Sequence, residues 1–461
     1  MGKRSREDDD KSEVKNVKKS AANGNGTIID PHCNPDHPRM IHFEDVTSAA
    51  FKIKNGVLNT PCTRSQLSEI CGMEIYLKKD FLQVTGSFKE RGARYALMML
   101  SEEQKKTGVI SASLGNHALA LCYHGKQLGI PVTVVMPVIA PIMKIQSCRN
   151  LGATVLTQGN DMGEAKRIAM TIGQEKKLCY INGYDHPHIM AGQGTIGLEV
   201  VEQVPDLDAI IVPVGGGGLI AGIATAIKAM KPKVQIIGVE SNRCPSFKAA
   251  QREGKPTMVP ITSTLADGLA VPTVGYNAFV TANPLINKMV VVGEEWIAIA
   301  ILRLIELEKS VVEGAGATGL AAILAGELDE LKGKKVVVLL CGGNIDTTIL
   351  GRCLERGLAA DGRLLKLTVC VSDRPGGIAE LCRLLADKGV SIKDMMHDRA
   401  WLTNDVFSVN VKVICETRDL EHSRDIIKTL HEKYEKVHFA HIPNLQIAPG
   451  RARELPEDHM V

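Results

Sequence analysis

The sequence predicts an α/β protein with mostly parallel sheets, followed by a small domain of a different class. Between residues 75 and 230, short apolar strands alternate with segments of helical spacing, the order typical of parallel sheets. Beyond residue 365 the expected order changes to βαββαβ, the ferredoxin-like arrangement. The chain has 461 residues, which is too long for one ordinary domain and suggests two or three.

The overall composition points to a small-molecule partner. A net charge of +3 and 4% aromatic residues give no basic stripe with stacking rings, so nothing favours nucleic acid. Residues 209–227 are uncharged and long enough to span a membrane, but Pro213 and four glycines would make a poor membrane helix. Twelve cysteines without a C-x-x-C pair fit free thiols in a reducing compartment, so we expect a cytoplasmic protein without a membrane partner.

Residues 1–38 are expected to form a disordered tail. As far as Gly26 the segment is charged and has almost no large apolar residues, so it cannot offset its own ordering entropy. No apolar core follows the positive charges, as a secretory signal would require. His32, Cys33 and His37 could ligate a metal, but their spacing matches no ligand pattern, and no metal is assigned to them.

A lysine follows a small glycine-containing turn in the stretch Thr-Gly-Ser-Phe-Lys-Glu-Arg-Gly, residues 85–92. A buried lysine beside an aromatic ring can have its ammonium pKa lowered by desolvation, and the free amine can then form a Schiff base with an aldehyde. Alone, this pattern also describes a solvated lysine at a helix start, so Lys89 is a candidate nucleophile only with support from elsewhere. The elements expected around it are helices at 43–50, 58–67 and 91–100 and a strand at 75–78.

A second loop, Ser113-Leu114-Gly115-Asn116-His117, lies between an expected strand at 108–112 and helical spacing. Such a helix entry offers free backbone N–H groups and the positive end of the helix dipole, which suit a carboxylate. A turn with a good N-cap would look the same. His186 and His188 are expected to be loop residues. The alternation continues with strands at 132–135 and 152–156 and helices at 140–151 and 162–175.

A run of four glycines, Gly215 to Gly218, separates a buried strand at 209–214 from a helix at 219–230. Consecutive glycines let the backbone approach closely and point several amides at an anion, which fits a phosphate. Glycines kept only for tight packing are the alternative. The loop lacks the Lys-Ser/Thr pair of a Walker motif and the spacing of a dinucleotide fingerprint, so the phosphate should belong to a smaller cofactor.

An apolar strand at 336–340 ends in Cys341-Gly342-Gly343-Asn344. Ligands in open α/β sheets lie at the carboxyl ends of strands, where this thiol is expected. A neutral thiol there could meet a ring nitrogen, whereas no histidine is evidently paired with it to make it a nucleophile.

A lysine for an aldehyde, amides for a phosphate and a neutral group for a ring nitrogen together specify pyridoxal phosphate. On these motifs, with Met136-Pro137 and Ala-Pro-x-x-Lys at 140–144, the chain resembles the serine/threonine dehydratases of the fold-type II, tryptophan-synthase-β-like class. The likeness runs from about residue 43 to residue 357 and implies two open, twisted α/β domains. The implied domains are a large one of residues 39–107 and 187–358 and a small one of residues 108–186.

The resemblance implies a role for each matching position. Lys89 would carry the cofactor and act as the catalytic base, Phe88 would pack beside the ring, and Asn116 would bond the ring hydroxyl. Asp267 is assigned only to the wall of the site. The other implied cofactor contacts are Gly215, Gly216, Gly217, Gly218, Leu219, Glu313 and Cys341. The implied substrate contacts are Ser113, Gly115, Asn116 and His117.

The implied reaction is β-elimination from L-threonine, and from L-serine, to a 2-oxo acid and ammonia. Serine racemases share most of these motifs, but they carry a serine as second base in the place of Leu114, and leucine cannot exchange a proton. The divalent-metal site of these racemases is incomplete in this chain. Glu240 is present, but Ser246 stands where the racemase pattern has an aspartate, so no metal is assigned. A catalytically silent sensor is the non-enzyme alternative, against which the intact motifs argue.

The C-terminal segment, residues 365–443, resembles an ACT domain, a module that binds amino acids or other small effectors and usually pairs across subunits. A homo-oligomer, dimer or tetramer, is therefore expected, although a purely structural dimerisation module is the alternative. The implied effector loop is Asp373, Arg374, Gly376, Gly377 and Ile378. The expected elements are strands at 367–371, 390–396, 406–414 and near 437, and helices at 378–388 and 420–433.

Overall fold

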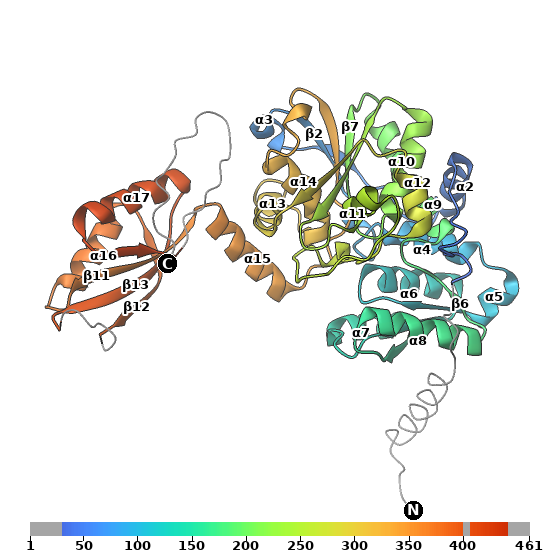
Figure 1. Ribbon diagram of the computed structural model, residues 1–461, viewed down its shortest axis with the longest axis horizontal. Helices are drawn as coiled ribbons and strands as arrows, with labels where there is room; N and C mark the ends of the chain where they lie inside the picture. Colours follow the sequence, from blue (N-terminus) through green and yellow to red (C-terminus); the bar gives the residue numbers. More distant parts are fainter. Residues whose placement is uncertain (1–29, 400–405, 441–461) are drawn as a thin grey trace, which may run out of the picture.

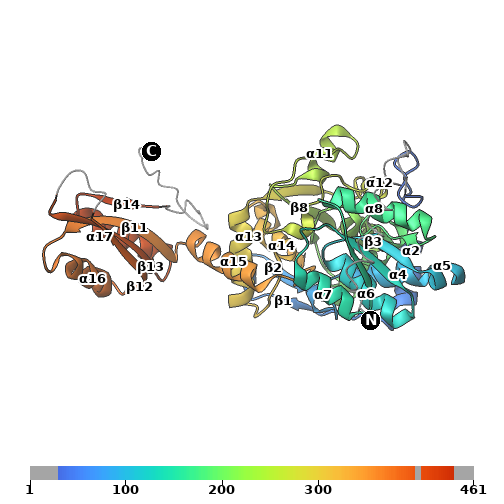
Figure 2. The same cartoon turned by 90° about the horizontal axis from the view of Figure 1, so that it is seen from below.

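The computed structural model describes residues 30–399 and 406–440 and contains three sheets (Figure 1). Two of them are parallel or nearly so and belong to the α/β body, while the third is antiparallel. Figure 1 and Figure 2 place this third sheet beside the body, joined to it through helix α15 (Thr347–Ala360). The predicted α/β class, with a smaller domain of βαββαβ order, is confirmed.

The largest sheet has six strands in the order β1-β2-β10-β7-β8-β9, and only β1 is antiparallel to its neighbour. Its central strands are continuous runs of β-branched residues because helices cover both faces. The strands are β1 (Cys62–Arg64), β2 (Glu74–Lys78), β7 (Ala209–Pro213), β8 (Gln235–Ser241), β9 (Lys288–Val292) and β10 (Lys335–Leu339).

Helices α9, α10 and α12 pack on one face of this sheet, and α13 and α14 pack on the other. The helices of this part are α2 (Phe43–Ile53), α3 (Leu67–Cys71), α4 (Lys89–Met98), α5 (Glu102–Thr107), α9 (Pro187–Gln203), α10 (Gly218–Met230), α11 (Ser246–Glu253), α12 (Tyr276–Ala282), α13 (Glu294–Glu306) and α14 (Gly314–Leu324). Three 3₁₀ turns accompany them, η1 (Asp80–Leu82), η2 (Asp267–Leu269) and η3 (Asp329–Leu331).

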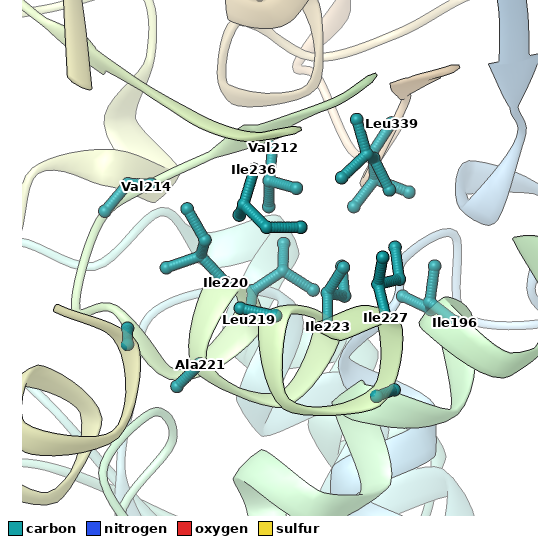
Figure 3. Packing of buried hydrophobic residues seen from close by; sticks show 14 of the residues in the cluster. Ile196, Val212, Val214, Leu219, Ile220, Ala221, Ile223, Ile227, Ile236 and Leu339 are labelled. Atoms are coloured by element: carbon teal, nitrogen blue, oxygen red, sulfur yellow. The ribbon is translucent and has the colours of Figure 1, made fainter. Parts of the chain in front are cut away.

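Helix α10 shows how the sequence fixes this packing. Figure 3 shows Leu219, Ile223 and Ile227 along the side of α10 that faces the sheet, with Val212 of β7 opposite them. Their spacing of four residues places them on one helical stripe. Because this stripe is buried against the sheet, the glycine loop that precedes α10 is held at the carboxyl end of β7.

The second sheet has four parallel strands in the order β5-β4-β3-β6, all from residues 109–180. Its helices pack on it through apolar stripes. The elements are β3 (Val109–Ala112), α6 (Asn116–Leu128), β4 (Val132–Met136), α7 (Ile142–Asn150), β5 (Thr154–Thr157), α8 (Met162–Glu175) and β6 (Cys179–Tyr180).

The third sheet has the order β12-β13-β11-β14 and is antiparallel throughout. Apolar residues of β11 and β13 form its core with two helices. The elements are β11 (Leu364–Ser372), α16 (Gly377–Asp387), β12 (Ser391–Asp398), β13 (Ser408–Glu416), α17 (Leu420–Lys433) and β14 (Val437–Phe439).

The helix predicted at 58–67 was wrong. Strand β1 lies there and pairs antiparallel with β2, with Thr63 opposite Leu77. Pro61 explains the error, because proline disfavours helical conformation at the residue before it and cannot donate an intrahelical hydrogen bond.

The described part of the predicted tail, residues 30–38, packs on the body. Asp30 is buried, and the backbone carbonyl of His32 accepts a hydrogen bond of 2.7 Å from Asn277 Nδ2. Residues 1–29 lie outside the described residues. Within the described ranges, no helix is both long and apolar enough to cross a membrane.

Candidate active site

Three neighbouring strands of the large sheet end at the same edge and deliver three of the predicted loops. Strand β2 leads through η1 to Lys89, β10 leads to Cys341, and β7 leads to the glycines at 215–218. Since β2, β10 and β7 are adjacent and parallel, residues far apart in sequence meet at their carboxyl ends.

The amine of Lys89 lies inside this edge, at the start of α4. Lys89 Nζ donates a hydrogen bond of 2.5 Å to the backbone carbonyl of Gly183 and lies 5.1 Å from the centre of the Phe88 ring. Burial lowers the pKa of Lys89 to about 8, although Cys341 and Glu313 oppose this change. Near neutral pH, part of the Lys89 population is therefore unprotonated and has an amine that can react as a nucleophile.

The turn that carries Lys89 is fixed to the end of β10. The backbone N–H of Phe88 donates to the carbonyl of Cys341 at 2.9 Å, and Ser87 forms an isolated β-bridge with Gly342. The Cys341 thiol is buried, and burial raises its pKa well above the usual value. The thiol is thus neutral, as the sequence analysis expected for a group that meets a ring nitrogen.

Asn116 links the second sheet to this edge. Its Nδ2 donates to Glu313 Oε1 at 2.8 Å, and its Oδ1 accepts from Asn344 Nδ2 at 2.8 Å. Asn344 Nδ2 also donates to the Thr85 carbonyl at 2.7 Å. Burial raises the pKa of Glu313 to about 7; Asp267 adds to this, while the Asn116 hydrogen bond and Lys144 oppose it.

The glycine loop is tightly packed as well as open to an anion. A Cβ built on Gly216 would lie 2.3 Å from Cγ of Tyr184, and one on Gly218 would lie 1.9 Å from the Tyr184 carbonyl oxygen. Gly217 has φ of +89° and is the N-cap of α10. The contacts confirm that these glycines are needed for close packing, and this packing brings the N–H groups of the helix start to the edge of the sheet. Phosphate binding by these groups stays a prediction.

The loop at 113–117 opens α6, with Gly115 as its N-cap. A Cβ on Gly115 would meet no atom within 4 Å, so there is room in front of this residue. The His117 ring is buried, lies 3.3 Å from the Ile181 carbonyl and has its pKa lowered to about 3 by burial. The N–H of Ser113 donates to the Val135 carbonyl at 3.3 Å, and that of Gly115 donates to Ser113 Oγ at 3.4 Å. The groups that this loop can offer an acid are therefore the N–H groups of the first turn of α6 and the Ser113 hydroxyl.

The sequence analysis missed Gly183 and Tyr184, which join the lysine to the glycine loop. Gly183 holds the Lys89 amine through its carbonyl, and the neighbouring Tyr184 packs on Gly216. No local sequence signal marks a backbone carbonyl as a functional group. His186 proved to be the N-cap of α9, while His188 lies within that helix rather than in a loop.

A buried network of charges supports the helix of Lys89 from behind. Arg91 donates to Asp80 at 2.7 and 2.8 Å and to Glu199 at 2.5 and 2.9 Å. Lys78 donates to Glu199 at 2.6 Å. The guanidinium of Arg91 is fully buried, so these contacts fix the first turn of α4, on which Lys89 lies.

Glu240 caps a helix in this structure. Its carboxylate accepts hydrogen bonds from the backbone N–H groups of Phe247 at 2.6 Å and Lys248 at 2.9 Å, at the start of α11. Ser246 is buried, and its hydroxyl has no partner. In the described part of the chain, no group of three or more His, Cys, Asp or Glu residues could hold a metal ion.

The residues present fit pyridoxal phosphate. A buried amine of lowered pKa suits the aldehyde, a neutral buried thiol suits the pyridine nitrogen, and the N-terminus of α10 suits the phosphate. Ser87 Oγ is buried without a partner beside the lysine, as is expected where a further group belongs.

Comparisons with known proteins agree with this geometry. The family model "Pyridoxal-phosphate dependent enzyme" matches residues 53–342. An L-threonine ammonia-lyase of Thermotoga maritima is 43% identical over 395 residues, covering 86% of this chain and 98% of the relative. An L-threonine ammonia-lyase of Geobacter sulfurreducens is 42% identical over 392 residues, covering 85% of this chain and 97% of the relative.

Solved structures of related enzymes have the same fold as the α/β body of this chain. Threonine deaminase isoform 2 of Solanum lycopersicum has a TM-score of 0.65 at 34% identity, covering 69% of this chain and 90% of that one. Maize serine racemase has a TM-score of 0.65 at 31% identity, covering 69% of this chain and 98% of that one. The chain belongs to the family of pyridoxal-phosphate-dependent enzymes.

Proposed function

We propose that this protein is an L-threonine ammonia-lyase that converts L-threonine to 2-oxobutanoate and ammonia and also accepts L-serine. The observation that carries the proposal is the buried amine of Lys89, held by Gly183 at the edge where the Cys341 thiol also lies. Two relatives that are more than 40% identical to this chain, and that are matched over nearly their whole length, are L-threonine ammonia-lyases.

Each residue has a defined task in this reaction. When bound, pyridoxal phosphate supplies an electron sink for the charge that develops at the substrate α-carbon. The Lys89 amine removes the α-proton, for which its pKa of about 8 is well matched to neutral pH. Cys341 remains neutral and so does not force a proton onto a ring nitrogen, which keeps the developing charge short-lived and favours loss of the β-hydroxyl.

The loop that follows strand β3 of the second sheet would orient the substrate. The backbone N–H groups of the loop at 113–117, at the N-terminus of α6, would bind the substrate carboxylate. Asn116 would contact the ring hydroxyl and is held for this by Glu313 and Asn344. Leu219 and the four glycines before it would bind the phosphate at the start of α10.

Serine racemase is the alternative activity, favoured by the similarity to the maize racemase structure. Racemisation needs a second proton-exchanging group on the other side of the substrate. Leu114, between Ser113 and Gly115 at the helix entry, has no such proton. Elimination is therefore the better-supported outcome.

The C-terminal domain is proposed to bind an amino-acid effector at its first loop, in the manner of an ACT domain. Asp373 is held by Arg399 at 2.8 Å, and Arg374 lies 5.9 Å from the centre of the Phe407 ring. Gly376 has φ of +105° and precedes α16, and a Cβ there would meet no atom within 4 Å, whereas one on Gly377 would lie 2.0 Å from the Ser372 carbonyl oxygen. A carboxylate would therefore have room in front of Gly376, at the helix start formed by Gly377 and Ile378. Pairing of these domains between subunits would make the enzyme a homo-oligomer.

All twelve cysteines are free, which supports a cytoplasmic location for the enzyme.

The test of the function uses the purified protein loaded with pyridoxal phosphate. Incubation with L-threonine, L-serine and D-serine is followed by assay of 2-oxo acids and chiral analysis of the remaining serine. Rapid 2-oxobutanoate release with no D-serine formed from L-serine supports the lyase, whereas D-serine without oxo acid would identify the racemase.

A further inference from the structure

A turn of the large domain lies directly against the proposed cofactor cradle. It is η2, Asp267 to Leu269, which follows the loop after α11. A Cβ on Gly215 would lie 3.0 Å from Leu269 Cα, and one on Gly268 would lie 3.6 Å from Glu313 Oε1. Asp267, the first residue of this turn, therefore lies at the rim of the site, beside the glycine loop and Glu313.

A lysine of the small domain reaches this rim from the opposite side. Lys144 lies in the first turns of α7, and its Nζ is 3.8 Å from Asp267 Oδ2. The two side chains are 32% and 70% exposed, so the pair lies at the solvent edge of the site and not in a core. Both charges act on the buried Glu313, in opposite directions.

The pair joins the two parts of the molecule that must stay together during turnover. The small domain carries the loop proposed to hold the substrate carboxylate, and the large domain carries Lys89 and Cys341. A second polar contact across the same boundary, between His124 Nε2 and Glu90 Oε2 at 3.2 Å, is fully buried where α6 packs on α4. The boundary thus has a tightly packed side and a solvent-exposed side, and Lys144 lies on the exposed one.

We propose that the ion pair between Lys144 and Asp267 is a latch that holds the small domain over the bound substrate, which makes Lys144 a positioning residue. The proposal rests on the function proposed above. It predicts that the latch acts on retention of the substrate and leaves the chemical groups intact.

The size of the effect follows from the exposure of the pair. Ion pairs of this kind contribute modestly, which corresponds to about a two- to fivefold rise in KM for Lys144→Gln with kcat nearly unchanged. Lys144 also acts on the carboxylate of Asp346, the N-cap of α15. Lys144→Glu therefore places a carboxylate near both Asp267 and Asp346 and should raise KM on the order of tenfold. Because salt screens exposed charges, the KM of the wild-type enzyme should rise with ionic strength and that of Lys144→Gln should not.

The decisive experiment is a charge swap. KM and kcat for L-threonine, cofactor content and hydrogen exchange of residues 142–150 are measured for Lys144→Glu, Asp267→Lys and the double variant. A matched control is Lys288→Glu, because Lys288 pairs with Glu330 at 2.6 Å with 40% and 48% exposed side chains on the outer strand β9. This control should leave KM unchanged.

The expected result is that each single reversal raises KM and speeds hydrogen exchange in α7, and that the double variant restores both. A double variant as poor as the worse single variant would overturn the latch. So would single variants whose KM equals that of Lys288→Glu. Hydrogen exchange with and without added L-threonine reports on the latch even if no 2-oxobutanoate is formed, so failure of the proposed function remains distinguishable.

Discussion

Replacement of Gly216 by alanine tests whether the glycine loop is fixed by packing. The added methyl group would lie 2.3 Å from Cγ and 2.9 Å from Cβ of Tyr184, shorter than any normal carbon contact. Rotation of the ring cannot relieve this, because the contacts involve atoms near the backbone and the Tyr184 N–H is bonded to Asn182 Oδ1 at 3.0 Å. Overpacking of this kind costs about 1 to 3 kcal/mol.

Two measurements test this prediction. Urea unfolding of the apoprotein gives the free energy of unfolding, and a separate titration of the folded apoprotein with pyridoxal phosphate gives the affinity for the cofactor. Gly216→Ala should lower the free energy of unfolding by about 1 to 3 kcal/mol and weaken cofactor binding, because the amides at the start of α10 move. Gly351→Ala is the control, since a Cβ there meets no atom within 4 Å and alanine favours α15 by about 1 kcal/mol. If Gly216→Ala were as stable as the wild type and bound cofactor equally well, the packing account of the loop would be refuted.

Two further predictions concern buried charges. Arg91→Met should cost about 3 to 5 kcal/mol in urea unfolding, because the buried Asp80 loses its guanidinium partner and Glu199 keeps only Lys78. A loss below about 1 kcal/mol would contradict the role of this network. Glu313→Gln should flatten the pH dependence of apoprotein stability. The pKa of Glu313 is raised from 4.5 to about 7 on folding, so between these values the folded state binds a proton that the unfolded state lacks, and the free energy of unfolding falls as pH rises. An equal slope in wild type and variant between pH 4.5 and 7 would contradict this pKa.

Sequence patterns predicted the elements that carry a strong local signal. The helices α8 and α17 begin and end where expected, because each has a side-chain cap, Asp161 or Asp419, before a regular apolar stripe. The helix expected at 140–151 is shorter in the structure, since α7 begins only at Ile142, after Pro141. The sequence patterns used here predicted neither β8 nor β9, whose places depend on neighbours distant in the chain.

In the candidate site, too, residues with a strong local sequence signal were predicted, and residues whose role depends on distant neighbours were not. Lys89, the glycine loop and Cys341 were found because each follows a strand and combines unusual residue types, and strand order then brings them to one edge. The Gly183 carbonyl and the Lys144 pair with Asp267 could not be found this way. A backbone carbonyl has no sequence signature, and an ion pair across two domains depends on how the domains meet.

The central claim is that Lys89 performs β-elimination on L-threonine with pyridoxal phosphate. The most direct measurement is 2-oxobutanoate release from L-threonine by the loaded wild-type protein and by Lys89→Ala supplied with the same cofactor, together with the visible absorption band of each. The wild type should show both the band and rapid release, and Lys89→Ala should lose the band of the lysine-bound cofactor and the turnover. A Lys89→Ala protein that still released 2-oxobutanoate at the wild-type rate would contradict the account.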